Sequence, residues 1–251
     1  MKIKFKIFII CILCSSNIYS QNIYDNIGDF KVGTILKFQN CSIENFDVGN
    51  DGDNVIWDFS NLKPINNDII VQLITEPDTI KEAKDYPQAT LVEKYSNGKY
   101  VFLKSDKENT YMLGFIDKKL KIQINYPKPV IISKRPFSLN KKIIEKYTTS
   151  YQVNNLNFSG HGTVTIEADG FGTLILPDKS YSNVLRIKIS QIQSDTLEQY
   201  NSKNEISIVT YMWADSKHSS ALLKATETTS PYHQEKRVEY LLDEIHVSAD
   251  R

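Results

Sequence analysis

The stretch TLVEKYSNGKYVFLK, residues 90–104, places two short runs of apolar and β-branched residues on either side of Asn97-Gly98. Asn-Gly favours a primed two-residue turn, which joins neighbouring antiparallel strands. The sequence therefore predicts a β-hairpin with strands over 90–95 and 100–104. The rest of the chain repeats this pattern of short β segments separated by turn residues.

A second hairpin is predicted over 110–116 and 120–126, around Asp117-Lys118. Later in the chain, Leu185 and Ile187 alternate with polar residues, which predicts a half-buried strand. One short helical turn is expected over 79–85. Further strands are predicted over residues 30–38, 69–74, 147–153, 163–168, 172–176, 206–213, 221–228 and 237–242.

These segments predict an all-β fold with few short helices. About 11–13 strands are expected, enough for one large antiparallel curved sheet or half-barrel, with a β-sandwich as the alternative. Tyr126–Pro129 is expected to interrupt the sheet, because proline cannot donate to a strand ladder. Residues 127–136 are thus a candidate internal break in an otherwise single domain over residues 21–251.

The first 20 residues have the organisation of a secretory signal peptide. Three lysines precede the apolar run Ile7–Leu13, and Ser20-Gln21 offers a cleavage point. We therefore expect export to the periplasm, the extracellular space or the cell surface. Lipoprotein processing at Cys14 is the alternative, although Leu13 stands where a small residue is expected. The apolar run Ile7–Leu13 is far short of the roughly 18 residues that a membrane-spanning helix needs, and no later stretch comes close, so no transmembrane segment is expected.

Charge and cysteine content exclude several classes of protein. Removal of residues 1–20 takes three lysines from a chain with 30 basic and 30 acidic residues, which leaves a net charge of −3. Without a basic stripe, nucleic-acid binding is not expected. Only Cys41 remains after cleavage, so the chain is not a disulfide-framed scaffold, and a buried thiol is expected.

Several motifs together resemble a group of uncharacterised exported proteins of the Bacteroidota type. They are Gly49–Ser60, Glu167–Asp178, Tyr181–Lys188 and the hairpin that includes Tyr211–Ser216. The resemblance implies an exported β protein and no particular chemistry. Many members carry a type IX secretion sorting domain, which we do not expect here because the sequence ends shortly after Glu244.

A fainter likeness concerns lipoprotein-carrier half-barrels (LolA-like). Phe30–Phe38, Tyr181–Lys188 and Tyr211–Trp213, the last followed by an apolar strand, are similar to segments of those proteins. The likeness implies a curved antiparallel sheet around an apolar hollow, whose concave face is filled by a helix, a loop or a ligand.

Aromatic residues supply the candidate ligand site. Trp57, Trp213, Tyr211 and Phe171 could stack on a sugar or line an apolar pocket, but aromatic residues also fill ordinary β cores. Arg186 is expected either on a solvated strand face or as a buried partner of a carboxylate.

A weak calcium candidate comprises Asp47, Asp51, Asp53 and Asp58, spaced partly like an EF-hand loop around Gly52. The same composition is typical of an ordinary turn, and no helices flank it.

Other catalytic patterns are sparse. Glu167 and Asp169 fall on one strand face, as neighbours rather than as a facing pair from separate strands. His161 lies between two glycines without a second ligand at metal-binding spacing. No phosphate-binding glycine loop or nucleophile elbow occurs, so no cofactor is expected.

The sequence therefore favours an exported, non-enzymatic binding module. It holds an apolar ligand or lipid in one version and binds an envelope protein or glycan in the other. A glycan-active hydrolase is a third alternative. An apolar concave face lined by several strands would favour the first version, and converging acids or histidines with shifted pKa values would favour an enzyme.

Overall fold

The computed structural model describes residues 23–153 and 156–247, so the expected signal peptide and Cys14 lie outside the described residues. The described chain is all-β, with three short 3-10 helices. Its elements are β1 (Ile23–Tyr24), β2 (Thr34–Cys41), β3 (Gly52–Asp58), β4 (Pro64–Thr75), η1 (Pro77–Thr79), η2 (Lys81–Asp85), β5 (Leu91–Tyr95), β6 (Lys99–Ser105), β7 (Asn109–Asp117), β8 (Ile122–Lys134), β9 (Phe137–Ser138), β10 (Lys142–Val153), β11 (Leu156–Ile175), β12 (Ser180–Leu197), η3 (Glu198–Tyr200), β13 (Ser202–Ala214), β14 (Leu223–Ser230) and β15 (His233–His246).

Twelve of these strands close into an antiparallel barrel. Their order is β10-β8-β7-β6-β5-β4-β2-β15-β14-β13-β12-β11, and β11 pairs again with β10. The predicted all-β antiparallel fold is confirmed, and the sheet closes on itself instead of forming two packed sheets. Outside the ring, β3 pairs in parallel with β11, and β1 forms a two-stranded ribbon with β9.

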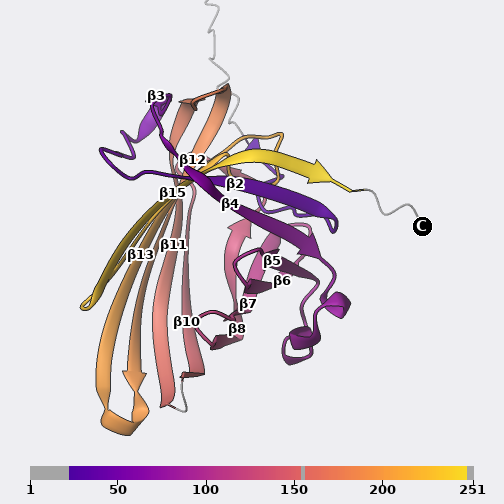
Figure 1. Cartoon of the computed structure of the whole chain (residues 1–251), viewed down its shortest axis with the longest axis vertical. Helices are drawn as coiled ribbons and strands as arrows, with labels where there is room; N and C mark the ends of the chain where they lie inside the picture. Colours follow the sequence, from indigo (N-terminus) through magenta and orange to yellow (C-terminus); the bar gives the residue numbers. More distant parts are fainter. Residues whose placement is uncertain (1–22, 154–155, 248–251) are drawn as a thin grey trace, which may run out of the picture.

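The two sides of the barrel differ in strand length. β11 and β12 have 20 and 18 residues, whereas β5 and β6 have 5 and 7. In Figure 1 the long strands β10 to β13 continue past the short strands at one end of the molecule. The contact that closes the ring between β10 and β8 is short, because β10 pairs with β8 only at Ser150–Gln152.

The predicted hairpin at Asn97-Gly98 is confirmed, but its turn is different. β5 and β6 are joined by the three residues 96–98, and Gly98 has a φ of 90° whereas Asn97 does not have a positive φ. A three-residue loop that ends in a left-handed glycine is the next most common hairpin connection after the primed two-residue turn.

The prediction that Tyr126–Pro129 interrupts the sheet is wrong. β8 runs through this segment, and the pairing with β7 jumps from Gly114↔Asn125 to Met112↔Val130. Residues 126–129 therefore form a bulge opposite Leu113. A bulge suits Pro127 and Pro129, because residues there do not need to donate to the ladder.

Asp169-Gly170 also lies in a bulge rather than between two strands. β11 is continuous, and its register with β12 shifts between Ala168 and Gly170. Gly170 has no side chain to collide with Trp57, whose ring would lie 2.7 Å from an added Cβ. The close approach of this ring explains the glycine.

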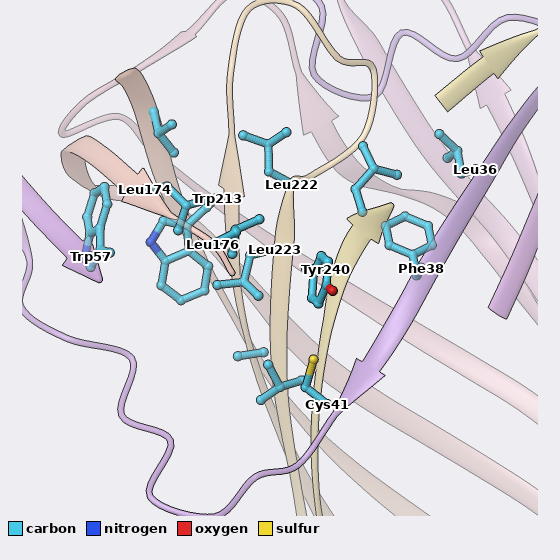
Figure 2. Close-up of a cluster of buried hydrophobic side chains, with 14 residues drawn as sticks. Leu36, Phe38, Cys41, Trp57, Leu174, Leu176, Trp213, Leu222, Leu223 and Tyr240 are labelled. Carbon is cyan, nitrogen blue, oxygen red and sulfur yellow. The ribbon is translucent and has the colours of Figure 1, made fainter. Parts of the chain in front are cut away.

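The apolar residues form clusters on both faces of the barrel wall. Inside, one cluster gathers around Val164, Ile166 and Leu185, and a second around Val101 and Leu103. Outside, two connecting segments cover the wall. The segment between β2 and β4, which carries β3, covers the part of the cluster in Figure 2 that surrounds Trp57 and Trp213. Phe38 of the same cluster lies instead beside the cavity-lining Lys224. The segment with η1 and η2 covers the outer face of β5 to β7.

Candidate ligand-binding cavity

A cavity of about 360 Å³ lies inside the barrel. Ten strands line it, β4 to β8 and β10 to β14, together with the segments 27–30 and 219–221. Eight strands enclose an interior that side chains can fill, while 16–18 strands leave an open channel. A twelve-stranded ring falls between these cases, so its side chains need not fill the space.

One side of the cavity is apolar. Its wall consists of aliphatic and thioether side chains from β7, β8 and β11 to β13, namely Met112, Val130, Ile132, Val164, Ile166, Ile189 and Met212. The strand alternation explains this face, because every second residue of a barrel strand points inward. β12 is an instance of this alternation: Leu185, Ile187 and Ile189 point inward, as the sequence predicts.

The opposite side is polar and charged. Gln72 of β4, Glu93 and Tyr95 of β5, Lys99 of β6 and Lys224 of β14 line it. The Tyr95 hydroxyl donates a hydrogen bond of 2.8 Å to Glu93 Oε2. Burial raises the pKa of Glu93 and lowers the pKa of Lys99, because the charged form of each group loses its hydration.

The two lysines differ in their surroundings. Lys224 Nζ lies 3.7 Å from Glu239 Oε1 and 3.9 Å from the centroid of the Phe38 ring. Within the described residues, Lys99 has no hydrogen bond or ion pair through its ammonium, which lies 5.2 Å from the centroid of the Phe115 ring. Gln72 Oε1 is likewise buried without a hydrogen-bond partner.

A second hollow of about 450 Å³ adjoins this polar side. It shares Tyr95, Lys99, Thr210 and Lys224 with the cavity. Its remaining lining includes exposed residues such as Asn97. We call this hollow the mouth, because it connects the polar wall of the cavity with solvent.

Along β12 the inner face changes from apolar to polar. Gln191 donates to the Tyr147 hydroxyl, which itself donates to Gln193 Oε1 over 2.8 Å. Gln193 then donates to both carboxylate oxygens of Asp195, and Tyr151 donates to Oδ2 of the same carboxylate over 2.8 Å. This ladder forms a polar border beside the cavity.

Gly160 and Gly162 leave room for the ladder. A Cβ on Gly162 would lie 2.4 Å from the Tyr147 ring, and one on Gly160 would lie 2.1 Å from Asp195 Oδ1. His161 between them is exposed in the middle of β11. The glycines therefore serve packing on the inner face of the strand rather than a turn.

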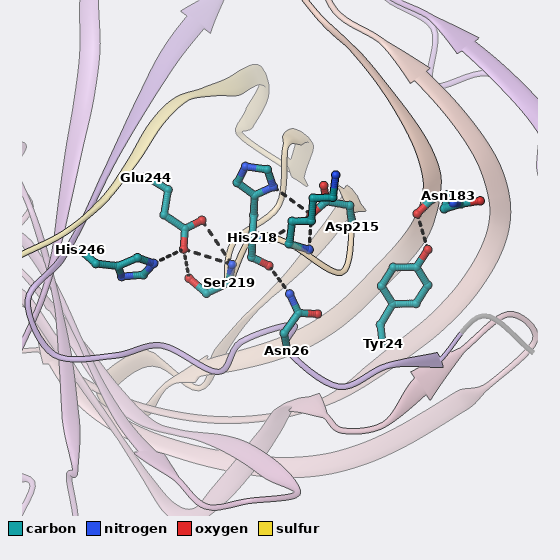
Figure 3. A network of polar contacts seen from close by, with 9 residues as sticks. Tyr24, Asn26, Asn183, Asp215, His218, Ser219, Glu244 and His246 are labelled. Atoms are coloured by element: carbon teal, nitrogen blue, oxygen red, sulfur yellow. Dashed lines mark hydrogen bonds and ion pairs between the residues drawn. The ribbon is translucent and has the colours of Figure 1, made fainter.

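The segment before β2 covers one end of the barrel, where Ile27 and Gly28 line the cavity together with residues 219–221. Gly28 N donates to Ser219 O over 3.0 Å. In Figure 3, Asn26 bonds to the His218 carbonyl (2.8 Å), and the Tyr24 hydroxyl bonds to the Asn183 carbonyl. Hydrogen bonds thus tie this cover to the loop between β13 and β14.

That loop has its own polar network (Figure 3). Asp215 Oδ1 accepts from the backbone amides of Lys217 and His218 and lies 2.9 Å from His218 Nδ1. The hydrogen bond with Asp215 raises the pKa of His218. Burial opposes ionisation of Asp215, but hydrogen bonds from His218 and the two amides hold its pKa below the usual value.

Three of the four predicted aromatic residues lie together, outside the cavity. Trp57, Trp213 and Tyr211 surround Arg186 on the outer face of the wall, with the guanidinium 5.1–5.9 Å from the three ring centroids. Trp57 and Trp213 are fully buried and meet edge to face, as Figure 2 shows. Phe171 packs against an interior cluster but does not line the cavity.

Of the two expectations for Arg186, a solvated position or a buried position beside a carboxylate, the second is confirmed. Its Nε lies 2.8 Å from Asp169 Oδ1, and its Nη2 lies 3.1 Å from Oδ2. Nη1 donates to the carbonyls of Val48 and Gly49. Arg186 therefore fastens the segment between β2 and β4 to the barrel wall. Glu167, by contrast, bonds to Lys142 near the surface.

The calcium candidates act as turn residues. Asp47, Asp53 and Asp58 each accept a nearby backbone amide, from Gly49, Asn54 and Ser60 respectively. Among the described residues, no three acids, histidines or cysteines gather closely enough to hold a metal ion. Asp51 is part of the same loop.

Cys41 is buried at the end of β2, and burial raises the pKa of its thiol to about 11. The expectation of a buried thiol is met. The thiol remains protonated at neutral pH, whereas nucleophilic and metal-binding cysteines react as thiolates.

Comparisons with known proteins identify no relative. No protein-family model matches the chain, and neither a curated protein nor a solved structure does. The resemblances drawn from the sequence motifs therefore stay predictions. In the described part of the chain, no helix combines the length and apolar character needed to span a bilayer.

Sequence reasoning did not identify the polar wall. Glu93 and Lys99 lie in the predicted hairpin, where charged residues ordinarily face solvent. They point inward because β5 and β6 belong to a closed ring, and their neighbours across the cavity come from β13 and β14. A pattern within the hairpin sequence cannot indicate that its side chains face strands more than 100 residues further along the chain.

Proposed function

We propose that this protein is an exported, non-enzymatic binding module that holds a small, largely apolar ligand inside its barrel. The observation that carries the proposal is the interior cavity of about 360 Å³ with aliphatic side chains from several strands. Small-molecule sites have volumes of roughly 300–1,000 Å³, mostly apolar walls and a few placed polar groups. The cavity meets each of these criteria.

The lining fits binding better than hydrolysis. A glycan-active hydrolase needs two carboxyl groups that face each other across the substrate. Among the described residues that line the cavity, Glu93 is the one acid, and it is hydrogen-bonded to Tyr95. The proposed cellular site is the envelope or the exterior, which rests on the signal-peptide pattern of residues 1–20.

Native mass spectrometry of protein purified gently from a bacterial envelope tests the proposal. We expect an additional mass that organic extraction releases as an apolar or amphipathic small molecule. Ile189→Trp, which fills the cavity, should abolish that mass. Ile192→Trp on the same strand is the matched control, because Ile192 is 55% exposed and does not line the cavity.

Both variants are first compared with the wild type by near-ultraviolet circular dichroism. If Ile189→Trp does not fold, Met212→Trp fills the same cavity from β13. Equal ligand occupancy in a folded cavity-filling variant and in the control would contradict the proposal. So would a bare polypeptide mass together with no binding of added single-chain amphiphiles.

A further inference from the structure

The charged side chains around the cavity differ in whether they have a hydrogen-bond or ion-pair partner. Glu93 accepts a hydrogen bond from Tyr95, and Glu239 lies within ion-pair distance of both Arg237 and Lys224. Within the described residues, the Lys99 ammonium has neither a hydrogen bond nor an ion pair, although it faces the cavity and the mouth. Glu93, Asp117 and Glu239 attract the Lys99 ammonium from a longer distance, but none of them accepts a hydrogen bond from it.

A half-buried ammonium without a partner is costly, because it loses hydration without gaining a hydrogen bond. The ring of Phe115 supplies only a weak attraction at 5.2 Å. The buried Gln72 Oε1, also without a partner, lines the same wall. A carboxylate is acceptor-only, so the group of this wall that it can satisfy is the Lys99 ammonium, whereas Gln72 Oε1 is itself an acceptor and needs a donor.

The position of Lys99 sets the orientation of such a ligand. Lys99 lies where the cavity meets the mouth, and the aliphatic wall of Val164, Ile166 and Ile189 lies across the interior. An anionic head beside Lys99 would keep access to water, while an alkyl chain would replace water along the aliphatic wall. The volume of about 360 Å³ is near the lower limit for small-molecule sites, so it suits one chain rather than a multi-chain lipid.

We propose that the cavity takes single-chain amphiphiles with a carboxylate head, and that Lys99 binds the carboxylate while the chain lies against β11, β12 and β13. This inference rests on the proposed function, because it names the ligand class of the same cavity. A charge-assisted hydrogen bond between ammonium and carboxylate is about twice as strong as a neutral one, so it discriminates between heads on the same chain.

The test is isothermal titration calorimetry of the chain from Gln21 onward with two probes, decanoate and 1-decanol, which share an alkyl chain. We expect decanoate to bind at least about tenfold more tightly than 1-decanol, as one charge-assisted hydrogen bond would provide. Lys99→Met should remove this preference and leave the affinity for 1-decanol within about twofold. Lys99→Arg should retain the preference, because it keeps the charge.

Lys203→Met is the matched control, since Lys203 is exposed on β13 and outside the cavity. Should Lys99→Met not fold, Lys99→Gln replaces it. Equal affinities of the wild type for both probes would overturn the carboxylate inference and leave the proposed function standing. Binding of neither probe would count against both. A Lys99→Met variant that loses both ligands equally would show a structural role for Lys99 and overturn the inference.

Discussion

Replacing Arg186 by methionine tests whether the outer cluster depends on its ion pair. Arg186 is 2% exposed, and its guanidinium bonds to Asp169 and to two backbone carbonyls. Methionine keeps most of the apolar stem but leaves the carboxylate and both carbonyls without their donor. Removal of one partner of a buried ion pair costs about 3–5 kcal/mol. We expect the lower end, about 3 kcal/mol, because the Asp169 side chain is 15% exposed and regains water.

The assay is equilibrium unfolding in urea, followed by tryptophan fluorescence. Trp57 and Trp213 lie beside Arg186, so their emission reports on the cluster itself. A lower midpoint with an unchanged slope indicates lost stability rather than a change in the unfolded state. Lys188→Met is the control, because Lys188 lies two residues along the same strand face and is half-buried. It forms no ion pair with a carboxylate in the described part of the chain.

The control should lose no more than about 0.5 kcal/mol, as is usual for substitutions near the surface. The reasoning would be refuted if Arg186→Met lowered the free energy of unfolding by less than about 1 kcal/mol and by no more than the control does. Arg186 also holds the carbonyls of Val48 and Gly49. The variant should therefore also show faster amide exchange in the segment between β2 and β4 than in the barrel strands, because that segment loses its fastening.

Two further predictions concern the inner face and the loop after β13. Gly162→Ala should cost about 1–3 kcal/mol in urea unfolding, because the new Cβ lies 2.4 Å from the Tyr147 ring, while His161→Ala should be nearly neutral. His218→Gln should destabilise the protein at pH 5.5 and much less at pH 9. The raised pKa of His218 provides stability below its usual 6.5, and this stability is lost as pH rises through the folded-state value. Asp215 has a lowered pKa, so its stabilisation is present above 3.8 and is lost as pH falls through the folded-state value. A wild-type-minus-variant difference in unfolding free energy that grows between pH 5.5 and 9 would contradict the second prediction.

Side-chain periodicity made parts of the fold predictable. Leu185 and Ile187 face the interior and Arg186 the exterior, as the alternation indicates, because successive residues of a strand point to opposite faces. The hairpin around Gly98 was found from its local turn chemistry. These features depend on a few neighbouring residues, and short sequences therefore carry them.

Breaks in the strands were harder to interpret. Tyr126–Pro129 and Asp169-Gly170 contain the residues that typically form turns, yet both lie in bulges within long strands. Proline and glycine occur in bulges for the same reason that they occur in turns, since neither place demands a regular ladder. Whether the chain turns or bulges depends on whether a partner strand continues past the site, which is a property of the whole sheet.

The placement of the aromatic residues relates the stability of the barrel to its hollow interior. Trp57, which belongs to the segment between β2 and β4, and Trp213 of β13 are fully buried against each other on the outer face. Tyr86, which directly follows η2, stacks on Phe102 of β6. Aromatic side chains bury the largest apolar areas, so much of the packing energy is gained outside the barrel wall. A barrel stabilised from outside does not need a completely filled interior. Packing on the outer face therefore offsets part of the cost of an unfilled cavity in the interior.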